Sequence, residues 1–177
     1  MNLAGNSTWQ ISCGDGGTYA LFVRDALGIS GPAADAIPPL TPPVPRRKAA
    51  VSPPELAQDW GRWWRECTAS GPGREPLGLP EGLRAAYREW GAFTSPESSR
   101  RRDDVRRGFD DTIREVVRDL EQELGRQPVF RLEVLQAPVQ GQFWLRLGDA
   151  KVFASEELLL SRHLAAPLDA VIRGLLH

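Results

Sequence analysis

The chain has 177 residues, a formal net charge of −1 and 41% hydrophobic residues, which is an ordinary globular composition with length enough for one sizeable core. The nearly balanced charge leaves no overall excess of positive charge to gather nucleic acid or anionic lipid. The two cysteines, Cys13 and Cys67, form neither a disulfide framework nor a Cys-x-x-Cys pair, so we expect reduced thiols and no metal or other cofactor.

The first 30 residues carry no basic stretch followed by an apolar run, and no later apolar run approaches membrane-spanning length, so we expect a cytoplasmic protein without membrane segments. Two apolar runs, Trp9 to Cys13 and Thr18 to Val23, flank the sequence Gly14-Asp15-Gly16-Gly17. This pattern predicts a β-hairpin within residues 1–30. A glycine cluster between a strand and a helix can cradle phosphate, but the strand-like second run favours a simple turn.

Residues 31–54 contain eight of the fifteen prolines. Because proline fixes φ and removes an amide donor, this segment is predicted to be an extended linker rather than a helix or a central strand. Pro39-Leu40-Thr41-Pro42 has the spacing of a ligand for an SH3-type groove, so the segment is either a plain spacer or an arm that binds a partner.

Three amphipathic helices are predicted after the linker. The first begins near Pro53 and carries Leu56, Trp60, Trp63, Trp64 and Cys67 on one face. The second covers about 80–93, and the third runs from Pro96 to a glycine stop at Gly125 with an unbroken apolar stripe.

From Phe130 the hydrophobic period changes from 3.6 to 2, which predicts strands at 130–134, 143–147 and 151–154, followed by two short helices. We expect the strands to form an antiparallel meander, with Trp144 on the face opposite Phe143. The predicted fold class is therefore α+β: a small antiparallel sheet, extended or not by the N-terminal hairpin, packed against amphipathic helices, with residues 55–177 as the main domain.

Residues that could carry chemistry are few. His163 and His177 are the only histidines, and Cys67 lies on the tryptophan face, where apolar burial raises the pKa of a thiol. Asp104, Asp111 and Glu115 share a face of the third helix and could form a cation or acid–base site, but neighbouring arginines favour a solvated ion-pair face. No catalytic residue is assigned.

The tryptophans are the most informative residues, because six in this chain is a high number and Trp63 and Trp64 are adjacent. Tryptophan is a frequent core residue and is also enriched in binding hot spots. As interface candidates we name Trp63, Trp64 and Trp144, together with Arg101 and Arg102 from the basic run 100–107.

We therefore favour a non-catalytic protein–protein interaction module of accessory, adaptor, inhibitor or immunity type, which binds another protein through aromatic side chains and the proline-rich arm. An enzyme or small-ligand-binding domain with an unrecognised site is the first alternative. A nucleic-acid binder that uses Arg100–Arg107 is the second. Arginine far outnumbers lysine, which is typical of a GC-rich bacterial genome.

Overall fold

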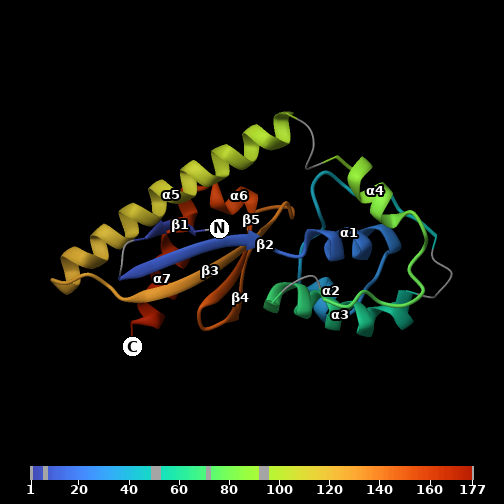
Figure 1. Cartoon of the computed structure of the whole chain (residues 1–177), viewed down its shortest axis with the longest axis horizontal. Helices are drawn as coiled ribbons and strands as arrows, with labels where there is room; N and C mark the ends of the chain where they lie inside the picture. Colours follow the sequence, from blue (N-terminus) through green and yellow to red (C-terminus); the bar gives the residue numbers. More distant parts are fainter. Residues whose placement is uncertain (1, 6–7, 49–52, 71–72, 92–95, 177) are drawn as a thin grey trace. The chain divides into compact units, whose positions relative to one another are not determined.

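The computed structural model describes residues 2–5, 8–48, 53–70, 73–91 and 96–176, and the chain forms two compact units (Figure 1). Unit 1 consists of Met1–Gly14, Arg100–Gln136 and Gly141–His177, and unit 2 consists of Asp15–Ser99 and Ala137–Gln140. These boundaries differ from the expected division at residues 30 and 54, because the proline-rich segment is part of a folded unit rather than a connection between two.

The mixed helix and sheet class predicted from the sequence is confirmed, and the sheet belongs to unit 1. It has five strands in the order β1-β2-β3-β5-β4. The strands are β1 (Asn2–Gly5), β2 (Trp9–Asp15), β3 (Phe130–Ala137), β4 (Trp144–Gly148) and β5 (Lys151–Ser155). The outer pairs β1/β2 and β4/β5 are antiparallel. The sheet is thus extended by N-terminal strands, as the sequence left open.

The order of the strands differs from the predicted meander. β5 lies between β3 and β4, so β3 and β4 are not neighbours. β2 and β3 run parallel, since Trp9 stacks on Phe130 near one end while the Cys13 thiol contacts Gln136 further along both strands. A parallel pair requires a long crossover connection, and residues 16–129 supply it.

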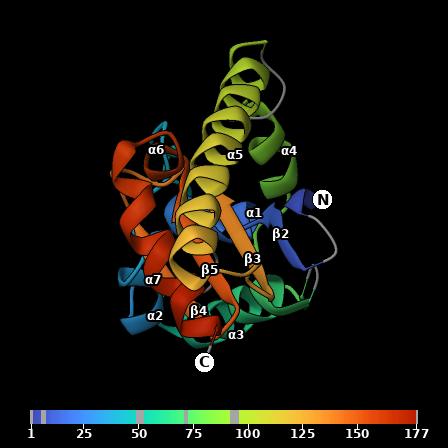
Figure 2. The same ribbon diagram turned by 90° about the vertical axis from the view of Figure 1, so that its left-hand side faces the viewer.

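One face of this sheet is covered by helices. They are α5 (Pro96–Leu124), α6 (Glu156–Leu159), the 3₁₀ turn η1 (Arg162–Leu164) and α7 (Ala165–Leu175). Figure 2 shows α5 and α7 beside each other over the strands. The buried cluster between them draws residues from both helices and from β2, β3 and β5, including Phe109, Ile113, Leu168, Ile11 and Val152. The apolar stripe predicted on the long helix is confirmed as the main contributor to this core.

Two polar features fix the ends of these helices. The Ser155 hydroxyl accepts a hydrogen bond from Leu158 N and so caps the short helix α6. The guanidinium of Arg173 on α7 binds Glu123 on α5 at 2.7 and 2.8 Å and also binds Asp169 at 2.8 Å. This fork joins the two helices on their exposed side.

Unit 2 is built from helices. They are α1 (Thr18–Leu27), α2 (Pro32–Asp35), α3 (Pro53–Ser70) and α4 (Leu83–Glu89). The prediction of a second strand at Thr18–Val23 was wrong, because these residues begin α1. This helix is buried on nearly every side, so its sequence lacks the 3.6-residue period and has the uninterrupted apolar run of a buried strand.

The proline-rich segment is not a free linker in the residues described, 31–48. Pro32 opens the short helix α2, and Ala34, Ile37 and Leu40 are buried. Leu40 also forms an isolated β-bridge with Val139. Residues 43–48 form neither helix nor strand, whereas residues 49–52 of the predicted linker lie outside the described chain.

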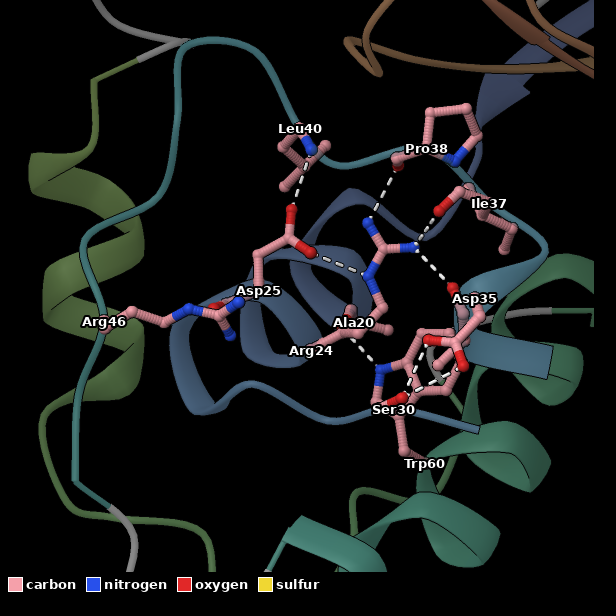
Figure 3. A network of polar contacts seen from close by, with 11 residues as sticks. Ala20, Arg24, Asp25, Ser30, Asp35, Ile37, Pro38, Leu40, Arg46 and Trp60 are labelled. Atoms are coloured by element: carbon pink, nitrogen blue, oxygen red, sulfur yellow. Dashed lines mark hydrogen bonds and ion pairs between the residues drawn. The ribbon is translucent and has the colours of Figure 1, made fainter. Parts of the chain in front are cut away.

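Arg24 on α1 holds this segment in place (Figure 3). Its side chain is only 4% exposed, and its guanidinium donates to the carbonyl oxygens of Ala34, Ile37 and Pro38 at 2.7 to 3.0 Å. Its Nε binds the carboxylate of Asp25 at 2.7 Å, and the other oxygen of that carboxylate accepts from Leu40 N. The cost of burying the positive charge of Arg24 is offset here, because the N–H groups of its guanidinium donate hydrogen bonds to backbone carbonyls and to the Asp25 carboxylate.

Across the parts of the chain that the structure describes, no helix combines the length and the apolar surface needed to cross a lipid bilayer.

Candidate ligand-binding pocket in unit 2

Unit 2 contains a pocket of about 780 Å³. Its walls come from α1, α3 and α4 and from the segments that precede α1 and α4. Eleven residues line it: Asp15, Gly17, Tyr19, Ala20, Trp63, Cys67, Gly73, Glu75, Arg84, Tyr87 and Arg88. A volume of this size lies within the usual range for sites that bind small organic molecules.

The glycine cluster forms one edge of this pocket. The chain runs from strand β2 through Gly16 and Gly17 directly into α1, so the cluster joins a strand to a helix and is not a hairpin turn. Gly17 has φ +74°, and a Cβ there would lie 3.3 Å from Cys67 Cβ and from Trp64 Cδ1. The loop therefore lies so close to α3 that a side chain at Gly17 would push its neighbours apart by a few tenths of an ångström and would also adopt an unfavourable positive φ.

A strand, a glycine loop and a helix N-terminus are the elements of a phosphate cradle, but here a carboxylate of the chain itself occupies that position. Thr18 N lies 3.2 Å from Asp15 Oδ1, and the Thr18 hydroxyl donates to the same oxygen. Asp15 thus caps the helix and opposes the binding of an anion at its N-terminus.

Two buried indoles position the pocket walls. Trp60 Nε1 donates to Ala20 O on α1 at 2.6 Å, and Trp64 Nε1 donates to Gly16 O at 3.2 Å. The two rings stack with centroids 6.2 Å apart. Both hydrogen bonds tie α3 to the α1 side of the pocket, so these tryptophans fix its shape without lining it themselves.

Three aromatic side chains form the pocket wall, one from each helix. The Tyr19 ring on α1 lies edge-on to Trp63 on α3, with centroids 5.6 Å apart, and 5.1 Å from Tyr87 on α4. Phe22 and Trp90 extend this cluster behind Tyr87. Aromatic rings at these distances attract one another and form a stiff surface against which a flat or apolar ligand can pack.

The thiol and the two phenols in the wall are held in their neutral forms. Burial, together with the negative charges of Asp15 and Glu66, raises the pKa of the Cys67 thiol to about 11. Burial and then Asp15 also raise the pKa of Tyr87, and burial raises the pKa of Tyr19. At neutral pH the pocket therefore presents an unreactive thiol and two phenol hydroxyls. The negative charge of Asp15 acts on both Cys67 and Tyr87.

The charged side chains differ in whether they have partners. Arg84 forms an ion pair with Glu75 and places its guanidinium 4.8 Å from the centre of the Tyr19 ring. Among the described residues, Arg88 makes no hydrogen bond or ion pair, and Asp15 has no cationic partner. Both Asp15 and Arg88 are exposed, so one unpaired charge of each sign faces solvent at the pocket.

The interface candidates named from the sequence lie in different places. Trp63 is 1% exposed and Trp64 is 5% exposed, so both are interior residues of unit 2 rather than surface anchors. Trp144 is half-buried and packs against the core cluster of unit 1, which is the reverse of the face predicted for it. The side chains of Arg101 and Arg102 lie outside the described residues.

The other chemical candidates do not come together. His163 is exposed, with Nδ1 2.7 Å from Gln142 Oε1, and His177 lies outside the described chain. Asp104, Asp111 and Glu115 are exposed, and Asp104 binds Arg107. In the described residues no cluster of His, Cys, Asp or Glu has the arrangement of a metal site.

Most of the pocket was missed from the sequence. Cys67 and Trp63 were singled out on the tryptophan face, but Asp15, Arg84 and Tyr87 lie on separate elements and match no short motif. The one available signal was the glycine cluster, whose role as a strand-to-helix connection depended on recognising α1 as a helix.

No protein-family model, no curated protein and no solved structure matches this chain, so the geometry alone supports the functional reasoning.

Proposed function

We propose that unit 2 is a small-ligand-binding domain and that the pocket between α1, α3 and α4 is its binding site. The observation that carries the proposal is the combination of volume and wall: about 780 Å³ lined by Tyr19, Trp63 and Tyr87 from three different helices. Binding sites for organic molecules are concave and mostly apolar, with a few convergent polar groups that fix orientation.

Two features favour a binding site over an active site. The Cys67 thiol, the one thiol among the lining residues, is held protonated by its raised pKa of about 11. No histidine is among the residues that line the pocket, so the base that usually activates a nucleophile is not supplied by this wall. The proposed role is therefore recognition.

The test uses the tryptophan side chains as reporters. With ¹⁵N-labelled indoles, a library of small organic fragments is added to the full chain, and the six indole N–H signals are followed by NMR. We expect a subset of fragments to shift the Trp63 signal, because Trp63 lines the pocket. The Trp9 signal is the internal control, since its ring lies in the core of unit 1.

A matched pair of variants checks the location. Cys67→Phe places a ring into the pocket from α3 and should abolish the fragment-induced shift of Trp63, whereas Cys67→Ser leaves the space open and should preserve it. If no fragment shifts Trp63, or if Cys67→Phe binds as well as Cys67→Ser, the pocket is not a binding site. Because the fragment titration of the natural sequence stands without either variant, a failure of Cys67→Phe to fold leaves the proposal testable.

The interaction module expected from the sequence remains a second proposal, and one observation favours it. Trp144 lies on β4, which is an outer strand of the sheet, and its indole is only half-buried. Outer strands present unpaired backbone groups to a partner chain, and tryptophan is enriched in such contacts. Capture experiments that compare Trp144→Ala with Trp9→Phe test this role, and a partner retained equally by both would contradict it.

A further inference from the structure

The unpaired charges at the pocket specify a class of ligand. If the pocket is the binding site proposed above, on which this inference rests, its occupant must satisfy Asp15 and Arg88 as well as the aromatic wall. We propose that the ligand is a ring-bearing zwitterion, either a free amino acid or a short peptide, whose ammonium group binds Asp15 and whose carboxylate binds Arg88.

The charge balance of the lining residues is the first argument. Glu75 and Arg84 neutralise each other directly, and Arg84 is further committed to the face of Tyr19. That leaves Asp15 and Arg88, which have opposite signs and no ion-pair partner among the described residues. A ligand with a single charge would satisfy one of them and leave the other to solvent, whereas a zwitterion satisfies both.

The place of Asp15 in the fold is the second argument. Its carboxylate is held in position by Thr18, whose amide and hydroxyl both donate to Oδ1. Among the described residues, the second carboxylate oxygen of Asp15 makes no hydrogen bond or ion pair, and the side chain is exposed. A fixed carboxylate beside aromatic rings attracts an ammonium group through its charge and through the faces of those rings.

Arg88 supplies the opposite end. It follows Tyr87 on α4 and lines the same pocket as Asp15, which is the last residue of β2. A guanidinium matches the geometry of a carboxylate with two parallel hydrogen bonds, which a single ammonium cannot do. The aromatic side chains that line the same pocket then pack against the ring of the ligand.

The experiment compares ligands that differ only in charge. The probes are L-phenylalanine, phenethylamine, 3-phenylpropionate and 2-phenylethanol, which carry both charges, the ammonium alone, the carboxylate alone and neither. The dipeptide phenylalanyl-phenylalanine is a longer zwitterion. Dissociation constants are measured from the shift of the Trp63 indole signal. We expect at least one zwitterion to bind about two- to fivefold more tightly than each singly charged probe, because solvent-exposed charge contacts are individually modest.

Two variants assign the charges. Asp15→Asn keeps an oxygen that can cap α1, and it should remove the advantage of the zwitterion over phenylpropionate. Arg88→Gln should remove its advantage over phenethylamine. Arg62→Gln is the matched control, since Arg62 is an exposed arginine on α3 that pairs with Asp59 and does not line the pocket. It should change neither ratio.

The outcomes separate this inference from the proposed function. If all probes bind equally, or if a singly charged probe binds most tightly, the ligand class is wrong while the pocket remains a binding site. If neither these probes nor the wider fragment library shifts the Trp63 signal, both the ligand class and the proposed function fail. If Arg62→Gln alters the preferences as much as Arg88→Gln, the charge assignment is wrong.

Discussion

Replacing Arg24 with methionine tests whether its guanidinium holds the proline-rich segment on α1. The side chain is 4% exposed and donates to Asp25, Ala34 O, Ile37 O and Pro38 O. Four hydrogen bonds from a charged donor correspond to about 6–12 kcal/mol if each contributes independently. The cost of burying the guanidinium offsets much of that sum, so removing it should lower the free energy of unfolding by about 3–5 kcal/mol.

The assay is urea unfolding followed by tryptophan fluorescence, which reports mainly on unit 2 because Trp60, Trp63, Trp64 and Trp90 all belong to it. Hydrogen exchange at Leu40, whose amide donates to Asp25, then shows whether the proline-rich segment is released. Arg24→Lys keeps the charge but loses the planar fork, and we expect it to recover only part of the stability.

The control is Arg62→Met, which removes an exposed arginine that pairs with Asp59. Exposed pairs of this kind contribute about 0–1 kcal/mol, so this variant should stay close to the natural protein. The reasoning is refuted if Arg24→Met is as stable as Arg62→Met, or if it is destabilised while exchange at Leu40 is unchanged.

Three further results are expected. Gly17→Ala should destabilise unit 2 by about 1–2 kcal/mol from its positive φ and by more from contact with α3. Gly82→Ala, in the same unit and also at positive φ but with open space around it, should show only the first effect in the same unfolding assay. Alkylation of Cys67 by iodoacetamide, followed by mass spectrometry in a variant without the other cysteine, should accelerate about tenfold per pH unit up to its pKa of about 11; a rate that levels off near neutral pH would contradict the buried thiol. The pKa of Glu123 should lie below that of an ordinary glutamate, because Arg173 binds its carboxylate. The stabilising contribution of this pair is therefore present above the unfolded-state pKa and is lost as the pH falls through the lowered folded-state pKa. NMR titration should show the pKa of Glu123 closer to normal in Arg173→Gln than in the natural protein.

The elements that could be predicted from the sequence are those with a clear period and clear ends. The long helix α5 has an apolar stripe and a glycine stop, and Ser155 marks the start of α6 as its sequence suggests. The tryptophan face of α3 was also correct, since Leu56, Trp60, Trp63 and Trp64 are all buried. In each case the pattern within one segment is sufficient, because packing only has to agree with it.

The errors arose where tertiary context decides. The residues of α1 are apolar on nearly every side, so period cannot distinguish a buried helix from a buried strand. The proline-rich segment resembles a linker in sequence because the hydrogen bonds that hold it come from Arg24 and Asp25. These two residues lie at least six positions before the segment, and no local pattern indicates that role. The insertion of β5 between β3 and β4 likewise follows from sheet pairing, which no single strand specifies.

The pocket was beyond reach for a related reason. Its unpaired charges lie at the end of β2 and on α4, more than 70 positions apart in the chain, and neither Asp15 nor Arg88 belongs to a recognisable motif. The aromatic wall was visible only as a high tryptophan count, which is equally consistent with a core. Binding residues that come from separate elements are identified from the three-dimensional structure, because their spacing in the sequence follows no motif.

The interrupted boundaries of the two units have a practical meaning for genetic dissection. The sequence of unit 1 is interrupted after β2 by residues 15–99 and continues in α5. Unit 2 therefore has the organisation of a domain inserted into unit 1. Unit 2 also includes the separate segment Ala137–Gln140. Thr41 N donates a hydrogen bond to Pro138 O, and Gln140 N donates one to Pro39 O. A fragment of residues 15–99 alone would therefore lack these two hydrogen bonds. Adding Ala137–Gln140 to that fragment through a linker should restore them.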